Sequence, residues 1–207
     1  FSRDGKAWQQ VAVPHDWAIS GPFDKKWDLQ MVAIEQNGET EKTEKSGRSG
    51  ALPWIGEGMY KMNWTAPKGY KRAVLVFDGA MSQPVVSVNG KEAGKWAYGY
   101  NAFRIDITPF IQFGKSNLIE VHLNNVEESS RWYPGGGLYR PVSVELYGNE
   151  NFSTWDTFVR TLKADKQEAE VEVNALLEGK TGKSGKTVIV LLDEAGKKVA
   201  EQIVTGA

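Results

Sequence analysis

Cysteine is absent from the 207 residues, which excludes disulfide bonds, thiol catalysis and cysteine-rich zinc sites but leaves the cellular compartment open. An excess of charge is also missing, because 25 Lys and Arg oppose 26 Asp and Glu for a formal net charge of −1. Without a strong field of one sign, neither nucleic acid nor a membrane surface is an expected partner. The longest hydrophobic runs, such as residues 73–77 and 188–192, hold five residues, against roughly 20 for a membrane-spanning helix.

What the sequence does contain is a regular alternation of apolar and polar residues. Apolar side chains occupy every second position in residues 60–64, 119–123 and 142–146, which is typical of strands with one buried face. Turn signals separate such segments, among them Asn89-Gly90 after residues 85–88. Helical spacing is not convincing in any long window. The chain is therefore predicted to be all-β, folded as a sandwich or jelly roll.

Two stretches interrupt this rhythm. Residues 24–50 are polar and contain glycine, and they predict a long solvated loop. Near residue 150 the composition changes, because seven of the eight tryptophans lie upstream, and we place a domain boundary at Gly148-Asn149-Glu150 between residues 1–148 and 149–207. The second domain offers about four strands: residues 157–162, 170–177, 187–192 and 198–204. An immunoglobulin-like sandwich needs roughly seven, so this one is expected to be incomplete, with raw sheet edges that leave it poorly ordered or paired with another copy.

Two glycine-rich segments look like nucleotide-binding loops but do not fit them. Residues 182–187 lack the first glycine of a phosphate-binding loop, because position 180 is Lys180, and they predict a hairpin turn followed by a strand. Residues 135–137 also precede a strand, whereas a dinucleotide fingerprint precedes a helix. The two histidines, His15 and His122, are far apart in sequence and His122 falls in the outward phase of its strand, so no zinc-type cluster is expected and a surface histidine is predicted there. No metal and no cofactor are expected.

Aromatic residues make up 11% of the chain, and several lie in predicted loops beside hydrogen-bonding residues. The clearest such segments are residues 13–17, 52–58 and 129–135. A sugar presents an apolar C–H face and a rim of hydroxyl groups, so an aromatic plane next to Arg, Asp or Asn suits it. Packing in the core is the commoner role of tryptophan in a small sandwich, and both roles stay open from the residues alone.

Six groups of residues between positions 8 and 147 occur together and in a fixed order. They are residues 13–17, 21–24, 56–60, 77–79 with 88–90, 103–108 with 124–125, and 130–142. Together they resemble the N-terminal domain of glycoside hydrolase family 2. The strongest piece is Ser-Arg-Trp-Tyr-Pro-Gly at residues 130–135, which is similar to the form found in β-galactosidase-like members. Residues 155–161 resemble the first strand of the family's second, immunoglobulin-like domain.

The resemblance implies a jelly-roll or galactose-binding-like β-sandwich, then an immunoglobulin-like sandwich, then a (β/α)₈ barrel. In this family the barrel supplies both catalytic glutamates for retaining hydrolysis of a β-glycoside, which needs two carboxyl groups roughly 5–5.5 Å apart. No barrel is predicted in this chain, so no residue of it is expected to be catalytic. The chain is expected to be the non-catalytic N-terminal fragment of a β-galactosidase-like enzyme of carbohydrate metabolism, inactive alone, that braces the barrel and completes its sugar pocket.

The family's first domain lends a loop to the rim of the sugar pocket. The resemblance places Arg131, Trp132 and Tyr133 in this loop, and Asp16 is also expected at the rim. Familiar members carry an Asp that helps to hold the sugar where this sequence has Arg131. Arginine donates hydrogen bonds in a planar fork and cannot accept them, so it suits sugar oxygens or a carboxylate, and the role of the Asp does not transfer directly. Structural or interface roles are expected for Trp17, Trp54, Tyr139 and Arg140.

Alternatives stay open at this point. The parent enzyme is alternatively a β-glucuronidase or a β-mannosidase, which share much of this framework. A free-standing carbohydrate-binding module would also carry aromatic loops without a catalytic pair, and a purely structural sandwich would keep all aromatics in its core. Expected partners are a β-linked sugar, through the full-length enzyme, and the enzyme's own barrel, with a homo-oligomer left open. A periplasmic or secreted location is slightly favoured over a cytoplasmic one.

Overall fold

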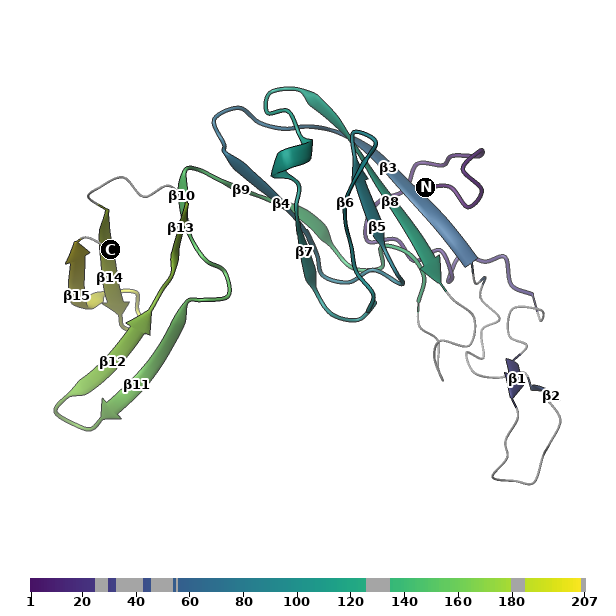
Figure 1. The fold of residues 1–207 in the computed structure, drawn as a ribbon. Helices are drawn as coiled ribbons and strands as arrows, with labels where there is room; N and C mark the ends of the chain where they lie inside the picture. The colour runs from purple at the N-terminus through teal and green to yellow at the C-terminus, as the bar shows by residue number, and fades with distance from the viewer. Residues whose placement is uncertain are drawn as a thin grey trace. The chain divides into compact units, whose positions relative to one another are not determined.

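The computed structural model describes residues 1–24, 30–32, 43–45, 54, 56–125, 135–179 and 185–205. The chain divides into two compact units, unit 1 with residues 1–146 and unit 2 with residues 147–207, and each is described by itself (Figure 1). The all-β prediction is confirmed, because the regular elements of the described residues are strands and one 3₁₀ turn, η3 (Thr108–Phe110). None of the helical structure described is long and apolar enough to cross a membrane.

Seven strands of unit 1 form the two β-sheets of a sandwich. One sheet has the strand order β3-β8-β5-β6 and the other the order β7-β4-β9. The strands are β3 (Gly56–Thr65), β4 (Arg72–Phe77), β5 (Val85–Val88), β6 (Lys91–Lys95), β7 (Phe103–Asp106), β8 (Ser116–Asn125) and β9 (Val142–Tyr147). The longest pairing joins β3 and β8 in antiparallel register, from Gly56 opposite Asn125 to Thr65 opposite Ser116.

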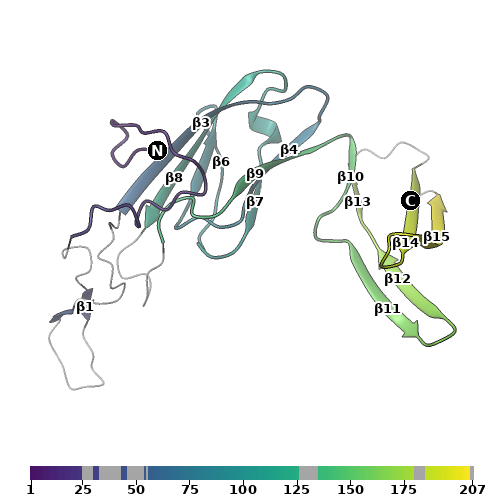
Figure 2. The same cartoon turned by 180° about the vertical axis from the view of Figure 1, so that it is seen from behind.

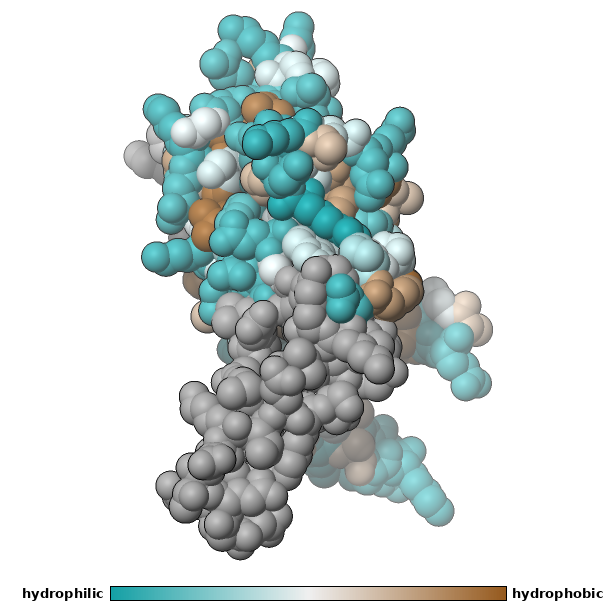
Figure 3. Space-filling view, turned by 90° about the vertical axis from the view of Figure 1, so that its right-hand side faces the viewer, coloured by the Kyte–Doolittle hydropathy of each residue, from teal (hydrophilic) through white to brown (hydrophobic). Residues whose placement is uncertain are grey.

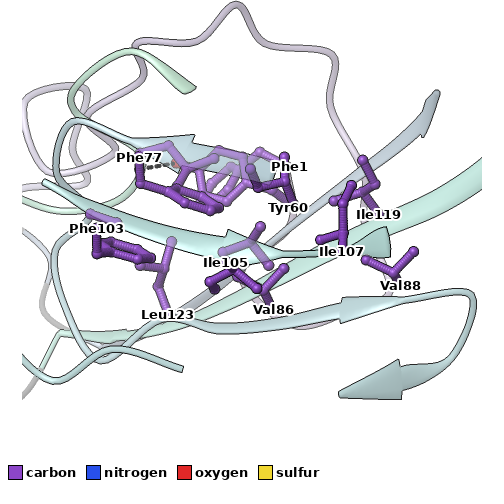
Figure 4. Packing of buried hydrophobic residues seen from close by; sticks show 14 of the residues in the cluster. Phe1, Tyr60, Phe77, Val86, Val88, Phe103, Ile105, Ile107, Ile119 and Leu123 are labelled. Atoms are coloured by element: carbon purple, nitrogen blue, oxygen red, sulfur yellow. Dashed lines mark hydrogen bonds between the residues drawn. The ribbon is translucent and has the colours of Figure 1, made fainter. Parts of the chain in front are cut away.

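The two sheets enclose one hydrophobic core (Figure 4). In β8 burial alternates as the sequence predicts, with Ile119, Val121 and Leu123 buried and the residues between them half-exposed. In the facing sheet Phe77 stacks on its register partner Phe103, with ring centroids 4.6 Å apart. Burial of each such side chain contributes roughly 1.5–3 kcal/mol. On the face shown in Figure 3, hydrophilic side chains predominate over scattered apolar ones.

The turn predicted at Asn89-Gly90 is confirmed. Both residues have positive φ, 51° for Asn89 and 76° for Gly90, as a two-residue turn between twisted antiparallel strands requires. The Asn89 side chain also accepts a hydrogen bond from the Leu118 N–H at 2.9 Å and donates to Asn117 Oδ1 at 3.0 Å. This turn therefore joins the β5–β6 hairpin to β8.

Two predicted strands are less buried than their alternation suggests. In β3, Tyr60 is buried, but Met62, in the same inward phase, is 60% exposed. In β9, Val142 and Val144 are only half-buried. The reason is topological, because β3 and β9 are the outer strands of their sheets. The sandwich of unit 1 is therefore open along this edge.

The long loop predicted at residues 24–50 falls mostly outside the described residues. Two short strands within it are described, β1 (Gln30–Val32) and β2 (Thr43–Lys45), and they pair in antiparallel register. At these residues the structure has short strands where a long solvated loop was predicted.

Unit 2 consists of three separate antiparallel ladders, seen from behind in Figure 2. They are β10 (Glu150–Phe152) with β13 (Leu177–Gly179), β11 (Phe158–Ala164) with β12 (Ala169–Asn174), and β14 (Lys186–Leu192) with β15 (Lys198–Thr205). The four expected strands are present. The hairpin turn predicted at residues 182–187 is wrong, because the strands on either side of it belong to different ladders. Ser153 is the single buried residue among those described in unit 2.

Candidate functional site

Three of the four residues expected at the rim of a sugar pocket fall in one segment. Arg131, Trp132 and Tyr133 belong to residues 126–134, the rim segment, which lies outside the described residues. Their expected roles therefore stay predictions. The residues that flank the rim segment and the elements that hold these flanks are described, and they define the candidate site.

The two flanks of the rim segment lie against each other. Asn125, the last residue of β8, donates a hydrogen bond from its side-chain amide to the carbonyl oxygen of Gly135 at 2.9 Å. Both residues are buried. A buried amide hydrogen bond is costly to leave unmade, so it holds the two ends of the rim segment together.

Asp16 connects the chain near its start to the second flank. Its Oδ1 accepts hydrogen bonds from the backbone N–H of Ala18 at 2.9 Å and of Gly136 at 3.0 Å. The backbone N–H of Trp17 donates to the carbonyl oxygen of Gly136 at 2.9 Å. An ionised carboxylate only accepts hydrogen bonds, which suits a position between two backbone donors. Asp16 is thus a backbone clamp for the flank, and its expected contact with sugar stays a prediction.

Trp17 fills the space behind this clamp and is fully buried. A Cβ atom at Gly58 would lie 2.3 Å from the Trp17 ring, and one at Gly136 would lie 2.5 Å from its Nε1, so both positions need glycine. Trp54 packs on Trp17 with ring centroids 5.5 Å apart, and the Arg3 guanidinium lies 4.7 Å from the centroid of Trp54. Within the described residues Trp17 Nε1 has no hydrogen-bond partner.

His15 is half-buried, and hydrogen bonds hold both its side chain and its backbone. Its Nδ1 lies 2.8 Å from the hydroxyl of Tyr60, and its backbone N–H donates to the carbonyl oxygen of Leu138 at 2.7 Å. Burial lowers the pKa of His15, helped by the positive charges of the amino terminus and Arg3, and this outweighs the opposing effect of Asp16. Burial also raises the pKa of Tyr60. Both side chains are therefore neutral near pH 7.

Tyr139 and Arg140 tie the second flank to two neighbouring loops. The Tyr139 hydroxyl donates to the carbonyl oxygen of Gly99 at 2.9 Å. Arg140 Nη1 donates to the carbonyl oxygens of Tyr100 at 2.9 Å and Asp78 at 3.2 Å. These bonds fix the loops within unit 1, and the expected interface role of the two side chains stays a prediction.

An aromatic hollow beside these loops was not predicted from the sequence. Trp96 stacks on Phe103 with centroids 5.5 Å apart and donates from Nε1 to Asn101 Oδ1 at 3.0 Å, and Tyr98 beside it is 59% exposed. The hollow is lined by Gln83, Pro84, Val85, Lys95, Trp96, Ala97 and Tyr98. The alternation of Trp96, Tyr98 and Tyr100 was the available signal. In the described part of the chain no group of three or more His, Asp or Glu side chains is placed to hold a metal ion.

Comparison with known proteins places these features among carbohydrate-active enzymes, although no family model matches the chain. A β-galactosidase of Bacteroides ovatus is 31% identical over 204 residues, which are 96% of this chain and 22% of that protein. A β-glucuronidase of Formosa agariphila is 24% identical over 218 residues, 93% of this chain and 21% of that protein. The crystal structure of a glycosyl hydrolase family 2 member from Bacteroides cellulosilyticus matches with a TM-score of 0.77 and 30% identity, over 100% of this chain and 26% of that one. The chain thus spans about a fifth to a quarter of the length of these proteins.

Proposed function

The chain belongs to glycoside hydrolase family 2, and on this premise we propose that it is the non-catalytic N-terminal part of a retaining, β-galactosidase-like member that hydrolyses terminal β-glycosidic bonds. Such hydrolysis needs an acid/base and a nucleophilic carboxyl group roughly 5–5.5 Å apart. In this proposal a barrel domain outside the chain supplies both groups. Unit 1 braces that barrel and contributes the rim segment to its sugar pocket.

The observation that carries this proposal is the double fixation of the rim segment. At the two ends of the rim segment, Asn125 donates a hydrogen bond to the carbonyl oxygen of Gly135. Asp16, from near the start of the chain, accepts a hydrogen bond from the backbone N–H of Gly136. A loop whose ends are fixed loses less entropy when its side chains engage a ligand, which is how a rigid scaffold supports a binding loop. The two flanks are buried and multiply bonded, which supports the proposal that the loop between them serves a binding site.

Arg131 is the residue through which this proposal is tested. A hydrogen bond to a charged group contributes about 1.5–3 kcal/mol, so Arg131→Ala in the full-length enzyme should lower kcat/KM roughly 10-fold or more. Arg131→Lys keeps the charge and should retain part of the rate. Arg160→Ala is the matched control, because Arg160 is an exposed arginine of unit 2 paired with Glu172 and should leave the kinetics unchanged. Unchanged kinetics in Arg131→Ala would remove Arg131 from the pocket.

The same variants decide between the two substrate classes that the names of the relatives suggest. A guanidinium binds a carboxylate through two charge-assisted hydrogen bonds, which are stronger than the hydrogen bonds that it donates to neutral sugar hydroxyls. If the full-length enzyme prefers aryl β-galactosides, Arg131→Ala should reduce turnover of these. If it prefers aryl β-glucuronides, and Arg131→Ala removes that preference, the β-galactosidase-like assignment is replaced by a β-glucuronidase.

A carbohydrate-binding module is the second candidate function, and the hollow at Trp96 and Tyr98 favours it. Exposed aromatic rings beside Lys95 and Gln83 offer stacking and hydrogen bonds of the kind that sugars use. Calorimetry of the 207-residue chain against a panel of sugars separates the two. A module binds alone and loses binding in Trp96→Ala, whereas a pocket rim without its barrel binds no sugar measurably.

A further inference from the structure

The aromatic hollow of unit 1 has the size and the chemistry of a site for one sugar unit. Its cavity measures about 550 Å³, which is within the range of small-molecule sites. Two aromatic rings line it, Trp96 with 39% and Tyr98 with 59% of the residue exposed. Lys95 is the one charged side chain among the described residues that line it, and Gln83 adds an amide.

Trp96 is fixed in the hollow as a flat platform. Its ring stacks on Phe103, a core residue labelled in Figure 4, with the two planes 7° from parallel. Its Nε1 donates to Asn101 Oδ1 at 3.0 Å, and its backbone N–H donates to the carbonyl oxygen of Pro84 at 3.0 Å. A ring whose orientation is fixed before binding loses little entropy when a ligand stacks on it.

Gln83 is held beside this platform in an uncommon backbone conformation. Its φ is 48°, in the left-handed region that residues other than glycine rarely adopt. Strained residues of this kind cluster at binding sites, where the surrounding structure maintains them. The exposed Gln83 amide and the Lys95 ammonium can bind the hydroxyl rim of a sugar, while the Trp96 ring suits its apolar C–H face.

The two residues before Gln83 connect the hollow to both flanks of the rim segment. Met81 exchanges backbone hydrogen bonds of 2.9 and 2.8 Å with Gly137 on the second flank. Beside the first flank, Asn124 donates from its backbone N–H to the Ser82 carbonyl at 2.9 Å and accepts from Ser82 Oγ at 2.6 Å. Gln83 therefore lies within roughly 15 Å of the residue where the rim segment begins.

The loop between β6 and β7, which borders the hollow, is joined to the second flank as well. Tyr139 and Arg140 bind the carbonyl oxygens of Gly99 and Tyr100 in this loop. Gly99 also packs on Met81, because a Cβ atom at Gly99 would lie 2.5 Å from the Met81 sulfur. The hollow and the flanks of the rim segment thus belong to one hydrogen-bonded frame.

We propose that the aromatic hollow binds one sugar unit of an extended substrate, a β-linked oligosaccharide or polysaccharide whose terminal sugar enters the pocket at the rim segment. The inference rests on the proposed function for the position of that terminal sugar. Trp96 stacks on the apolar face of the bound unit, and Gln83 and Lys95 bind its hydroxyl groups. One stacked ring with few hydrogen bonds holds a free sugar only weakly. The hollow therefore acts when its sugar is joined to the one in the pocket, because the linkage raises the effective concentration.

Kinetics of the full-length protein test the inference with aryl β-galactoside and β-1,4-linked galacto-oligosaccharides of two to five units. In the unmodified protein kcat/KM should rise with the length of the oligosaccharide. Trp96→Ala should lower kcat/KM for the five-unit probe roughly 10-fold more than for aryl β-galactoside. Trp8→Ala is the matched control, because Trp8 is 40% exposed and donates from Nε1 to a backbone carbonyl, that of Gly5, outside the hollow.

Tyr98→Ala guards against a folding defect, because Tyr98 is more exposed than Trp96, whose ring stacks on the core. It should also lower kcat/KM more for the five-unit probe than for aryl β-galactoside. Equal losses for all probes in both variants would mean that the hollow supports the fold or is covered by another domain, and would overturn the inference. An unchanged ratio in both variants would overturn it as well.

Affinity electrophoresis of the full-length protein provides a readout that needs no turnover. In gels that contain β-1,4-galactan or hydroxyethyl cellulose, a β-1,4-glucan, the unmodified protein and Trp8→Ala should be retarded more than Trp96→Ala. If the unmodified protein hydrolyses no aryl β-glycoside, the proposed function fails, while this difference in retardation still supports the hollow as a sugar site. Equal migration of all three proteins in both gels would overturn the inference.

Discussion

Units 1 and 2 are both built of strands, but they bury their side chains very differently. Every buried hydrophobic residue described lies in unit 1, whereas the apolar residues described in unit 2 are half-buried or exposed, Trp155 by 77% and Ile203 by 46%. Unit 1 pairs strands that are distant in sequence, such as β3 with β8, while two of the three ladders of unit 2 join consecutive strands. An alternating sequence therefore predicts a strand, but a core also needs a second sheet that faces it.

The largest expected difference between the units is at their tryptophans. Trp17→Ala removes a fully buried side chain from unit 1 and should lower the free energy of unfolding by about 3–5 kcal/mol. Trp155→Ala in unit 2 should change it by less than about 0.5 kcal/mol. Urea denaturation followed by circular dichroism measures both. Similar losses of unfolding free energy in the two variants would show that Trp155 is packed in a core of unit 2, which would contradict the contrast between the units.

The two units should also differ in how they tolerate one added methyl group at a glycine. Gly136→Ala would place a Cβ 2.5 Å from Trp17 Nε1, and the resulting overpacking should cost about 1–3 kcal/mol. Gly148→Ala, at the start of unit 2, has no atom within 4 Å of its new Cβ and should be neutral or slightly stabilising. Thermal unfolding measures the midpoint temperature of both variants. An unchanged midpoint in Gly136→Ala would argue against close packing of Trp17 on the flank of the rim segment.

Asp16 and Asp193 make the same kind of bonds in the two units. Each accepts two backbone N–H bonds, Asp16 from Ala18 and Gly136 and Asp193 from Ala195 and Lys197. Asp16→Ala leaves the half-buried donor of Gly136 unpaired and should cost about 1–3 kcal/mol, together with a lower kcat/KM in the full-length enzyme. The exposed turn of Asp193 can bind water instead, so Asp193→Ala should cost less and leave kcat/KM unchanged. Equal effects on kcat/KM would contradict a specific role for the Asp16 clamp.

The smallest expected effect is a dependence of the free energy of unfolding on pH. It should arise in unit 1, which contains both histidines. Folding lowers the pKa of His15. Below the ordinary histidine pKa of about 6.5, the unfolded chain therefore binds more protons than the folded chain does. The stability contributed by neutral His15 is complete above this value and is lost as the pH falls below it. Denaturation between pH 5 and pH 7 should show this slope, and His15→Gln should reduce it.

The sequence predicted the features that depend on local pattern. The strands and the Asn89-Gly90 turn follow from side-chain alternation and from the tolerance of these two residues for positive φ. The half-burial of His15 and the exposure of Met62 could not be predicted, because each depends on which distant strand lies beside it. The contact of Asp16 with Gly136 was equally hidden, since 120 residues separate the two positions.

The candidate site was predicted only in part, for a similar reason. Two motifs near Asp16 and Gly135 stood out as separate segments, and the structure brings them together through backbone hydrogen bonds that carry no side-chain signal. The hollow at Trp96 was missed because an aromatic residue in a loop can equally be part of the core. Arg131, Trp132 and Tyr133 stay predictions from the sequence.

The division of labour between this chain and a separate catalytic domain is tested most directly by a hydrolysis assay. The purified 207-residue chain and the full-length protein are compared on aryl β-galactoside and aryl β-glucuronide at equal molar concentration. The full-length protein should release the aryl alcohol from at least one substrate. The chain alone should release none above the buffer blank. Reproducible turnover by the chain alone would contradict this division of labour.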